Sequence, residues 1–208
     1  ASEHLALSGV STLLAVSVGI PVGVMASRRR LGFSAGPLLG LANVGQALPT
    51  VAVLALMFTV TGLGFRTAVA ALFLYSLLPV LANTLVGIRS VDPSLVEAAR
   101  ATGMRPLQVL WRVELPVALP ILLAGVRTAA VLNVGTAALA TFAGAGGLGA
   151  IVEVGINNQR DRLLYVGSSL TALLALAVEW AIGLVGRIVC VAAGVRGARI
   201  PGQRPFDQ

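Results

Sequence analysis

The sequence is short of charged side chains, which make up 11% of its 208 residues. An ordinary soluble domain carries about 25%, so there are too few charges here to cover the surface of a water-soluble globule. Intrinsic disorder is excluded as well, because it needs low hydrophobicity together with high charge, whereas 57% of these residues are apolar. The composition therefore indicates a polytopic membrane protein.

Cysteine and histidine are almost absent, with one residue of each, Cys190 and His4. A single cysteine excludes a disulfide framework within the chain, and so small a set cannot form a Cys/His metal site, so we expect no metal ion. An integral-membrane enzyme would need a His, Cys or paired-carboxylate cluster. The sequence shows none, which disfavours that class of protein.

Five apolar stretches are long enough to cross a bilayer, at about 20 residues for each span. All should be helices, because backbone groups exposed to lipid must form hydrogen bonds within their own segment. The predicted fold is therefore all-α, with a transmembrane domain over residues 1–190 and a tail over residues 191–208. The predicted spans are residues 5–26, 36–61, 67–88, 120–142 and 163–189.

The distribution of arginine predicts the orientation of these spans. In a soluble protein a net charge of +7 would suggest nucleic acid, but the charges here lie between apolar segments, so no nucleic-acid partner is expected. Placing the polar loop 89–119 in the cytoplasm puts eleven arginines inside against three outside, as the positive-inside rule requires. Five spans then leave the N-terminus outside the cell membrane and the C-terminus in the cytoplasm.

This loop contains the start and stop signals of a short helix. Asp92 followed by Pro93 is typical of an N-cap with proline at the first helical position, and Ser94 with Glu97 also fits a capping box. Gly103 can end the helix in the left-handed conformation. A capped surface helix of this kind is either a docking element for a partner or a plain connector.

A second short helix is expected to follow over residues 105–114. It should end before the membrane, because Leu115-Pro116 interrupts the helical pattern. One face of this helix is apolar and consists of Leu107, Leu110 and Trp111.

The loop resembles the EAA loop shared by the permeases of binding-protein-dependent ABC importers. The pattern of that family is Glu-Ala-Ala, three residues, Gly, nine residues and then Ile-x-Leu-Pro. This chain has Glu97-Ala98-Ala99, Gly103 after three residues, and Val113-Glu114-Leu115-Pro116 after nine more. It departs from the pattern only at Val113, which conservatively replaces isoleucine.

The resemblance implies that the first short helix lies in a groove of a cytoplasmic ATPase subunit and moves with it. The chain has no phosphate loop of the form G-x-x-x-x-G-K-[ST]. ATP and its magnesium ion should therefore be bound and used on that partner, and this chain should be a transport subunit without a cofactor of its own. Carried over residue by residue, the coupling residues are Glu97, Ala98, Ala99, Arg100 and Gly103.

The wider chain resembles the osmoprotectant branch of the family, whose permeases carry glycine betaine, carnitine or choline. The resemblance implies ATP-binding cassette subunits, a second permease copy or a homologous permease, and an extracellular substrate-binding protein as partners in a bacterial cell membrane. Few aromatic residues are present for a cation–π cage, so the binding protein should provide the high-affinity selection. The segments that carry the resemblance are residues 47–50, 72–79, 91–95 and 144–149.

Two alternatives to an osmoprotectant permease remain at this point. The chain could carry another small solute, such as an amino acid, because related importers share much of this layout. A stand-alone secondary transporter would need carboxylates in the membrane core and an internal inverted repeat. The sequence shows neither of these, and the docking loop would then have no partner.

Two ionisable residues, Arg127 and Glu179, fall within predicted spans at similar depth. Because an isolated charge in hydrocarbon is costly and successive spans are often neighbours, we predict a structural ion pair between them. In the alternative, Arg127 reaches the cytoplasmic interface and Glu179 lines the path. Neutral polar groups in spans either bond to neighbouring helices or line a water-filled path. The candidates for the translocation path are Asn43, Gln46, Tyr75, Asn83, Asn133 and Thr136.

Two glycine patterns also carry predictions. Gly19 and Gly23 form a GxxxG pair, which favours close packing against another helix. The glycine-rich segment 144–149 should be a short re-entrant or interfacial element rather than a phosphate cradle. The polar residues that follow it form either a docking surface for a binding protein or a plain solvated loop. They are Glu153, Asn157, Asn158, Arg160 and Asp161.

Overall fold

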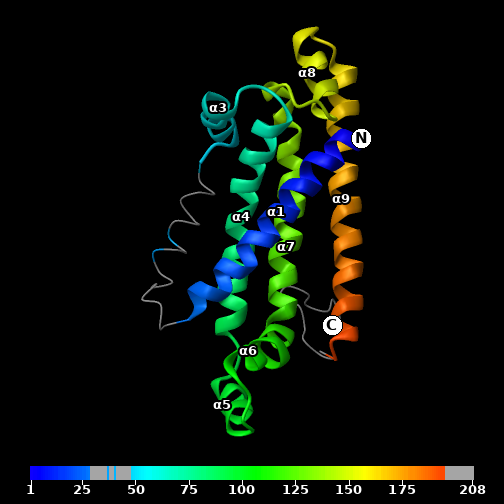
Figure 1. Ribbon diagram of the computed structural model, residues 1–208. Helices are drawn as coiled ribbons and strands as arrows, with labels where there is room; N and C mark the ends of the chain where they lie inside the picture. Colours follow the sequence, from blue (N-terminus) through cyan, green and yellow to red (C-terminus); the bar gives the residue numbers. More distant parts are fainter. Residues whose placement is uncertain (29–36, 38–39, 41–47, 195–208) are drawn as a thin grey trace.

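The computed structural model describes residues 1–28, 37, 40 and 48–194 of the chain. Within these residues the regular structure is entirely helical, which confirms the all-α prediction. Four helical segments are long and apolar enough to cross a membrane, and they form the bundle in Figure 1. They are α1 (Ser2–Ser27), α4 (Phe65–Arg89), the segment Pro106–Thr136 that contains most of α7 (Leu115–Ala137), and α9 (Asp161–Ala192).

Shorter elements lie at the two ends of the bundle (Figure 1). One end, called the loop end below, consists of α5 (Pro93–Ala101), α6 (Pro106–Val109) and the π-helix η2 (Leu110–Glu114). The opposite or far end consists of α3 (Thr50–Thr61), the 3₁₀ helix η3 (Leu139–Ala143) and α8 (Gly149–Asn157). The N-terminus lies toward the far end, and α9 finishes toward the loop end.

Glycine brings α1, α4 and α7 into close contact. A Cβ atom added to Gly23 of α1 would lie 2.7 Å from the Thr84 Cβ of α4, and Gly19 one turn earlier is equally confined. A Cβ atom added to Gly125 of α7 would lie 2.6 Å from the Cβ of Asn83. The close packing predicted from Gly19 and Gly23 is therefore present between α1 and α4.

The second predicted span, residues 36–61, is not one continuous helix. Leu48 and Pro49 are not helical, and the helix after them, α3, has 12 residues. Pro49 has extended backbone and is the N-cap residue of α3, a position where the missing N–H of proline costs no helical hydrogen bond. Most of residues 36–47 lie outside the described residues, and the predicted count of five spans is approximate.

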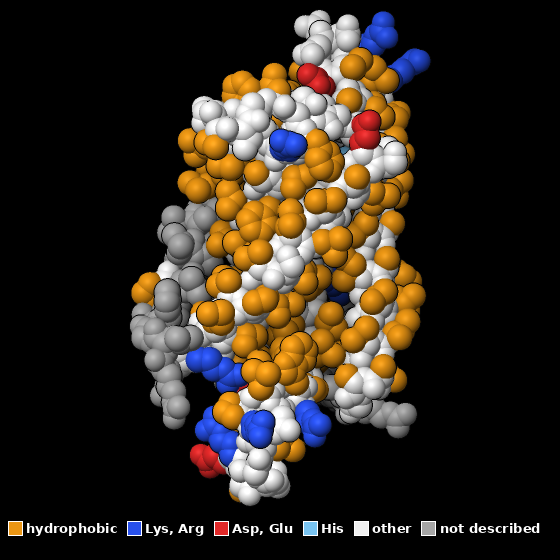
Figure 2. All heavy atoms as spheres, viewed as in Figure 1, with side chains coloured by type: hydrophobic (Ala, Val, Ile, Leu, Met, Phe, Trp, Pro, Cys, Tyr) orange, Lys and Arg blue, Asp and Glu red, His pale blue; other side chains and the backbone are white. Residues whose placement is uncertain are grey.

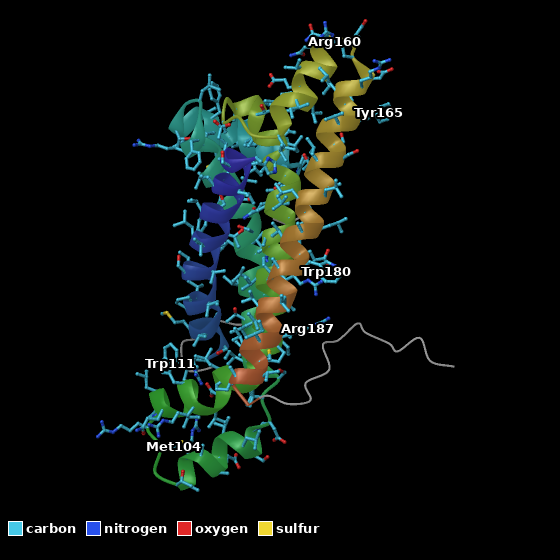
Figure 3. The ribbon with its side chains drawn as sticks, turned by 90° about the vertical axis from the view of Figure 1, so that its right-hand side faces the viewer. Met104, Trp111, Arg160, Tyr165, Trp180 and Arg187 are labelled. Carbon is cyan, nitrogen blue, oxygen red and sulfur yellow. The ribbon has the colours of Figure 1, made fainter. Side chains whose placement is uncertain are left out.

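The predicted break at Leu115-Pro116 is wrong, because the helix continues through it. The Leu115 N–H donates to the Leu110 carbonyl in a π-helical step, so η2 joins α6 to α7 without interruption. The wider π turn accommodates Pro116 near the start of α7, where its missing N–H is tolerated. The chain bends here: the segment that carries Trp111 lies across the loop end, while α7 follows the bundle (Figure 3).

Replacing Gly23 with alanine should destabilise the bundle, because the added methyl group would meet Thr84 and overpacking costs about 1–3 kcal/mol. The matched control is Gly9→Ala in the same helix, where nothing lies within 4 Å of the added Cβ. Alanine favours the helix by about 1 kcal/mol over glycine, so this control should melt at the same temperature as the wild type or higher. Thermal unfolding in detergent measures both variants, and a Gly23→Ala variant as stable as the Gly9→Ala control would contradict the packing.

Candidate functional site

The start of α5 has the cap that the sequence predicts. The Oδ1 atom of Asp92 accepts a hydrogen bond of 2.8 Å from the backbone N–H of Ser94, and Pro93 lies in the first turn. This bond lowers the pKa of the Asp92 carboxyl group, because it stabilises the charged form. Asp92, rather than the alternative box of Ser94 with Glu97, is therefore the N-cap.

Gly103 ends α5 in the left-handed conformation, with φ of 83°. Its N–H donates to the Arg100 carbonyl at 2.9 Å, and the N–H of Met104 donates to the Ala99 carbonyl at 3.3 Å. These two bonds form a Schellman motif, which satisfies carbonyls that the helix end would otherwise leave unpaired. With a cap at each end, α5 is a well-defined nine-residue helix.

The predicted coupling residues divide between two faces of α5. Ala99 is buried and contributes to the packing of the loop. The exposed residues of the set, which are available to a partner, are Glu97, Ala98, Arg100 and Gly103.

The second part of the loop exposes two large apolar side chains. Leu107 of α6 is 69% exposed and Trp111 of η2 is 66% exposed, and Trp111 stands at the side of the loop end in Figure 3. Tryptophan and arginine are the residue types that most often dominate the energy of protein interfaces, and Figure 2 shows arginine side chains gathered around this end. The predicted coupling set omits Leu107 and Trp111, although their helical spacing indicates this face. The exposed arginines of the loop end are Arg89, Arg100, Arg105 and Arg112.

An apolar cluster packs the loop against the bundle. Its buried members include Ile88 at the end of α4, Val91 after it, and Leu122 of α7. Partly buried Val96 of α5 and Leu110 of η2 pack against them. A movement of α5 would therefore be transmitted to α4 and α7.

The ion pair predicted within the membrane is present in the structure. Arg127 Nη2 of α7 donates to Glu179 Oε1 of α9 at 2.6 Å. The two side chains are 38% and 37% exposed, and they lie in a largely apolar cleft of about 700 Å³ between the two helices. The pair thus links α9 to the rest of the bundle in a region where α9 has few buried residues.

Asn133 is buried among three helices, which agrees with the packing alternative rather than with a path. The side chain has no exposed surface. In the amide orientation that satisfies its neighbours, the nitrogen donates to the Leu72 carbonyl at 3.0 Å, and the oxygen accepts from Ser76 at 3.1 Å and from the Thr12 hydroxyl at 2.9 Å. Asn133 of α7 therefore bonds to both α1 and α4.

The other described candidates for the path also bond within the chain. Asn83 donates to the Pro79 carbonyl of its own helix at 2.8 Å, and Thr136 donates to the Leu132 carbonyl at 2.7 Å. The Tyr75 hydroxyl donates to the carbonyl of Leu48 at 3.2 Å. Among the described residues no hydrogen bond joins one path candidate to another. The two remaining candidates, Asn43 and Gln46, lie outside the described residues.

The glycine-rich segment forms a turn that the start of α1 holds in place. Glu3 accepts a hydrogen bond from the N–H of Gly147 at 3.1 Å. The Nδ1 atom of His4 accepts from the N–H of Leu148 at 3.3 Å, so its proton is on Nε2, which donates to the Val134 carbonyl at 2.8 Å. No local pattern in the sequence predicts these roles of Glu3 and His4, because their partners lie more than a hundred residues away.

The polar residues after this turn lie around α8 and the start of α9, at the far end of the bundle (Figure 1). Glu153 accepts a hydrogen bond from the Thr141 hydroxyl at 3.1 Å. The others are exposed and available to a partner, as Figure 3 shows for Arg160. They are Asn157, Asn158, Arg160 and Asp161.

Comparisons with known proteins converge on one family. The model of the family described as "Binding-protein-dependent transport system inner membrane component" matches residues 19–189. The choline transport system permease protein OpuBB of Bacillus subtilis is 37% identical over 89% of this chain and 84% of its own length. The carnitine transport permease protein OpuCD of Listeria monocytogenes is 42% identical over 89% and 82%. An inward-facing structure of the MetNI methionine ABC transporter shares the fold, with a TM-score of 0.77 at 24% identity over 90% and 93%.

Removing either charge of the Arg127–Glu179 pair should destabilise the packing of α7 against α9. Polar contacts between membrane helices contribute about 1 kcal/mol, so Arg127→Gln and Glu179→Gln should each lower the melting temperature in detergent. The double variant Arg127→Glu with Glu179→Arg should recover most of the lost melting temperature. Arg187→Gln in the same cleft is the control, because Arg187 belongs to neither ion pair found among the described residues. A double variant no more stable than the single ones would refute a structural pair.

Proposed function

Because the chain belongs to the family of inner membrane components of binding-protein-dependent transport systems, we propose that it carries an osmoprotectant into the cell. Its general role, the multi-pass membrane permease of an ABC importer, follows from that family. The proposed substrates are small quaternary ammonium solutes such as choline, carnitine and glycine betaine. The similarity to permeases named for choline and carnitine supports this choice.

The proposed coupling to an ATPase rests on one observation, the capped and exposed helix α5. It presents Glu97, Ala98 and Arg100 to solvent, and its two ends are held by the Asp92 cap and the Gly103 turn. We propose that this helix docks in a groove of an ATP-binding subunit, where ATP and its magnesium ion are bound and hydrolysed. The exposed Leu107 and Trp111 would extend the same docking surface.

The distribution of arginine supports an orientation with the loop end in the cytoplasm. Exposed arginines gather around α5 and α6 (Figure 2), and cytoplasmic segments are enriched in this residue. The far end, with α8 and the N-terminus, would then face outward, where a substrate-binding protein could dock. Residues 1–190 would form the transmembrane unit and residues 191–208 a cytoplasmic tail. A second permease copy, or a homologous permease, would complete the path.

Reversing the charge of Glu97 should weaken the docking of the ATPase subunit. An interface charge that loses its partner typically costs about 2–5 kcal/mol, so Glu97→Arg should reduce copurification of the ATPase and ATP-driven uptake by at least about tenfold. Membrane insertion of the permease should be unchanged. Asp161→Arg makes the same change on an exposed acid at the far end and should leave ATPase copurification intact. Full copurification with Glu97→Arg would exclude α5 as the docking helix.

The substrate class can be tested in vesicles that contain the permease, its ATPase subunit and its binding protein. Labelled choline, carnitine and glycine betaine should accumulate only when ATP is present on the ATPase side, and each should compete with the others. Methionine should neither accumulate nor compete. ATP-dependent uptake of methionine without uptake of the three osmoprotectants would replace the proposed substrate class with amino acids. Uptake in vesicles that lack the ATPase would instead indicate a secondary transporter.

A further inference from the structure

A second ion pair joins the loop end directly to α1. Arg28 is the first residue after α1, and Glu114 is the last residue of η2. The guanidinium group donates from Nη1 to Glu114 Oε1 at 2.9 Å and from Nη2 to Oε2 at 2.5 Å. The contact is therefore bidentate, the geometry that makes arginine–carboxylate pairs strong and directional.

Glu114 depends on this partner because it has almost no contact with solvent. The residue is 4% exposed, whereas the Arg28 side chain is 35% exposed. A buried carboxylate without a partner is strongly destabilised, by several kcal/mol. The pair therefore fixes the position of η2 relative to the end of α1. An ion pair exposed on the surface would contribute little to this.

η2 is the element through which a movement of the docking helix would reach the bundle. It follows α6 directly, and it contacts α5 as well as α7. The chain also changes direction at this π turn (Figure 3). A shift of α5 on a moving ATPase would consequently displace Glu114, and Glu114 would pull on Arg28.

α1 connects the loop end to the other end of the molecule, because it is one continuous helix over Ser2–Ser27. It packs closely on α4 at Gly19 and Gly23, where an added Cβ atom would meet Val80 and Thr84. At the far end its Glu3 and His4 bind the backbone N–H groups of the glycine-rich turn. α8 follows that turn directly. Each end of α1 thus holds a functional segment through charged or polar side chains.

We propose that Arg28 and Glu114 are positioning residues that couple the movement of the docking loop to α1, and through α1 to the glycine-rich turn at the far end. This inference rests on the proposed docking of an ATPase on α5. In this arrangement the ion pair is not needed for the ATPase to bind. It is needed for ATP hydrolysis to be converted into transport.

The test measures ATP hydrolysis and solute uptake separately in vesicles that contain the complete importer. The Glu114→Gln variant keeps the size of the side chain but removes the charge. It should retain ATPase copurification and hydrolysis but transport about tenfold less solute per ATP, within the usual range of coupling between sites. Exchanging the charges, Arg28→Glu with Glu114→Arg, should recover at least half of the wild-type ratio.

The control is Arg66→Gln at the start of α4, which is exposed, lies away from the loop end and belongs to neither ion pair found among the described residues. Its uptake per ATP should equal that of the wild type. Melting temperatures in detergent show whether Glu114→Gln folds, and the charge exchange tests the pair even if this single variant is unstable.

Three outcomes would overturn the inference. In the first, Glu114→Gln transports as much solute per ATP as the wild type. In the second, the charge-exchange variant folds but recovers no transport per ATP. In the third, the Glu114→Gln importer loses its ATPase subunit. Failure of the proposed docking is distinguishable, because it appears in Glu97→Arg as undiminished ATPase copurification.

Discussion

Close contact between helices through glycine is the constraint on which the rest of this structure depends. In lipid, helices are not driven together by the hydrophobic effect, so they associate through tight packing and polar contacts. Gly23 and Gly125 allow α1 and α7 to approach α4. That approach brings Thr12, Ser76 and Asn133 within bonding distance, and a buried amide without these partners would be costly. Packing by small residues is therefore what makes the polar interior possible.

The features that were predictable from the sequence are those that depend on residues close in the chain, or on the composition and position of a segment along it. α5 was predictable because the cap at Asp92 and the turn at Gly103 are made by residues close in the chain. The apolar stretches predicted helices because lipid leaves the backbone few alternatives. The Arg127–Glu179 pair follows from depth and chain order, because successive spans are often neighbours and two charges at the same level reduce each other's cost in hydrocarbon.

The features that the sequence did not predict depend on contacts between distant segments or on unusual backbone. Pro116 was interpreted as a break, because the π turn that accommodates it has no sequence pattern of its own. Arg28 and Glu114 are 86 residues apart, and nothing in the sequence distinguishes Arg28 from the two arginines that follow it. The sequence alone cannot distinguish a packing role from a pore-lining role for Asn133, because that depends on its neighbours in the fold.

The polar contacts of the bundle are concentrated on α7 and the turn that leads into it. From the loop end to the far end, this segment pairs with α1 at Glu114, with α9 at Arg127, with α1 and α4 at Asn133, and with α1 again at the carbonyl of Val134. The same segment continues into α6 and the loop end in one direction and into the glycine-rich turn in the other. A shift of α7 alone would strain or break these contacts with α1, α4 and α9. Under the proposed coupling, a movement that begins at α5 would reach α1 and α9 through the contacts that α7 makes with them.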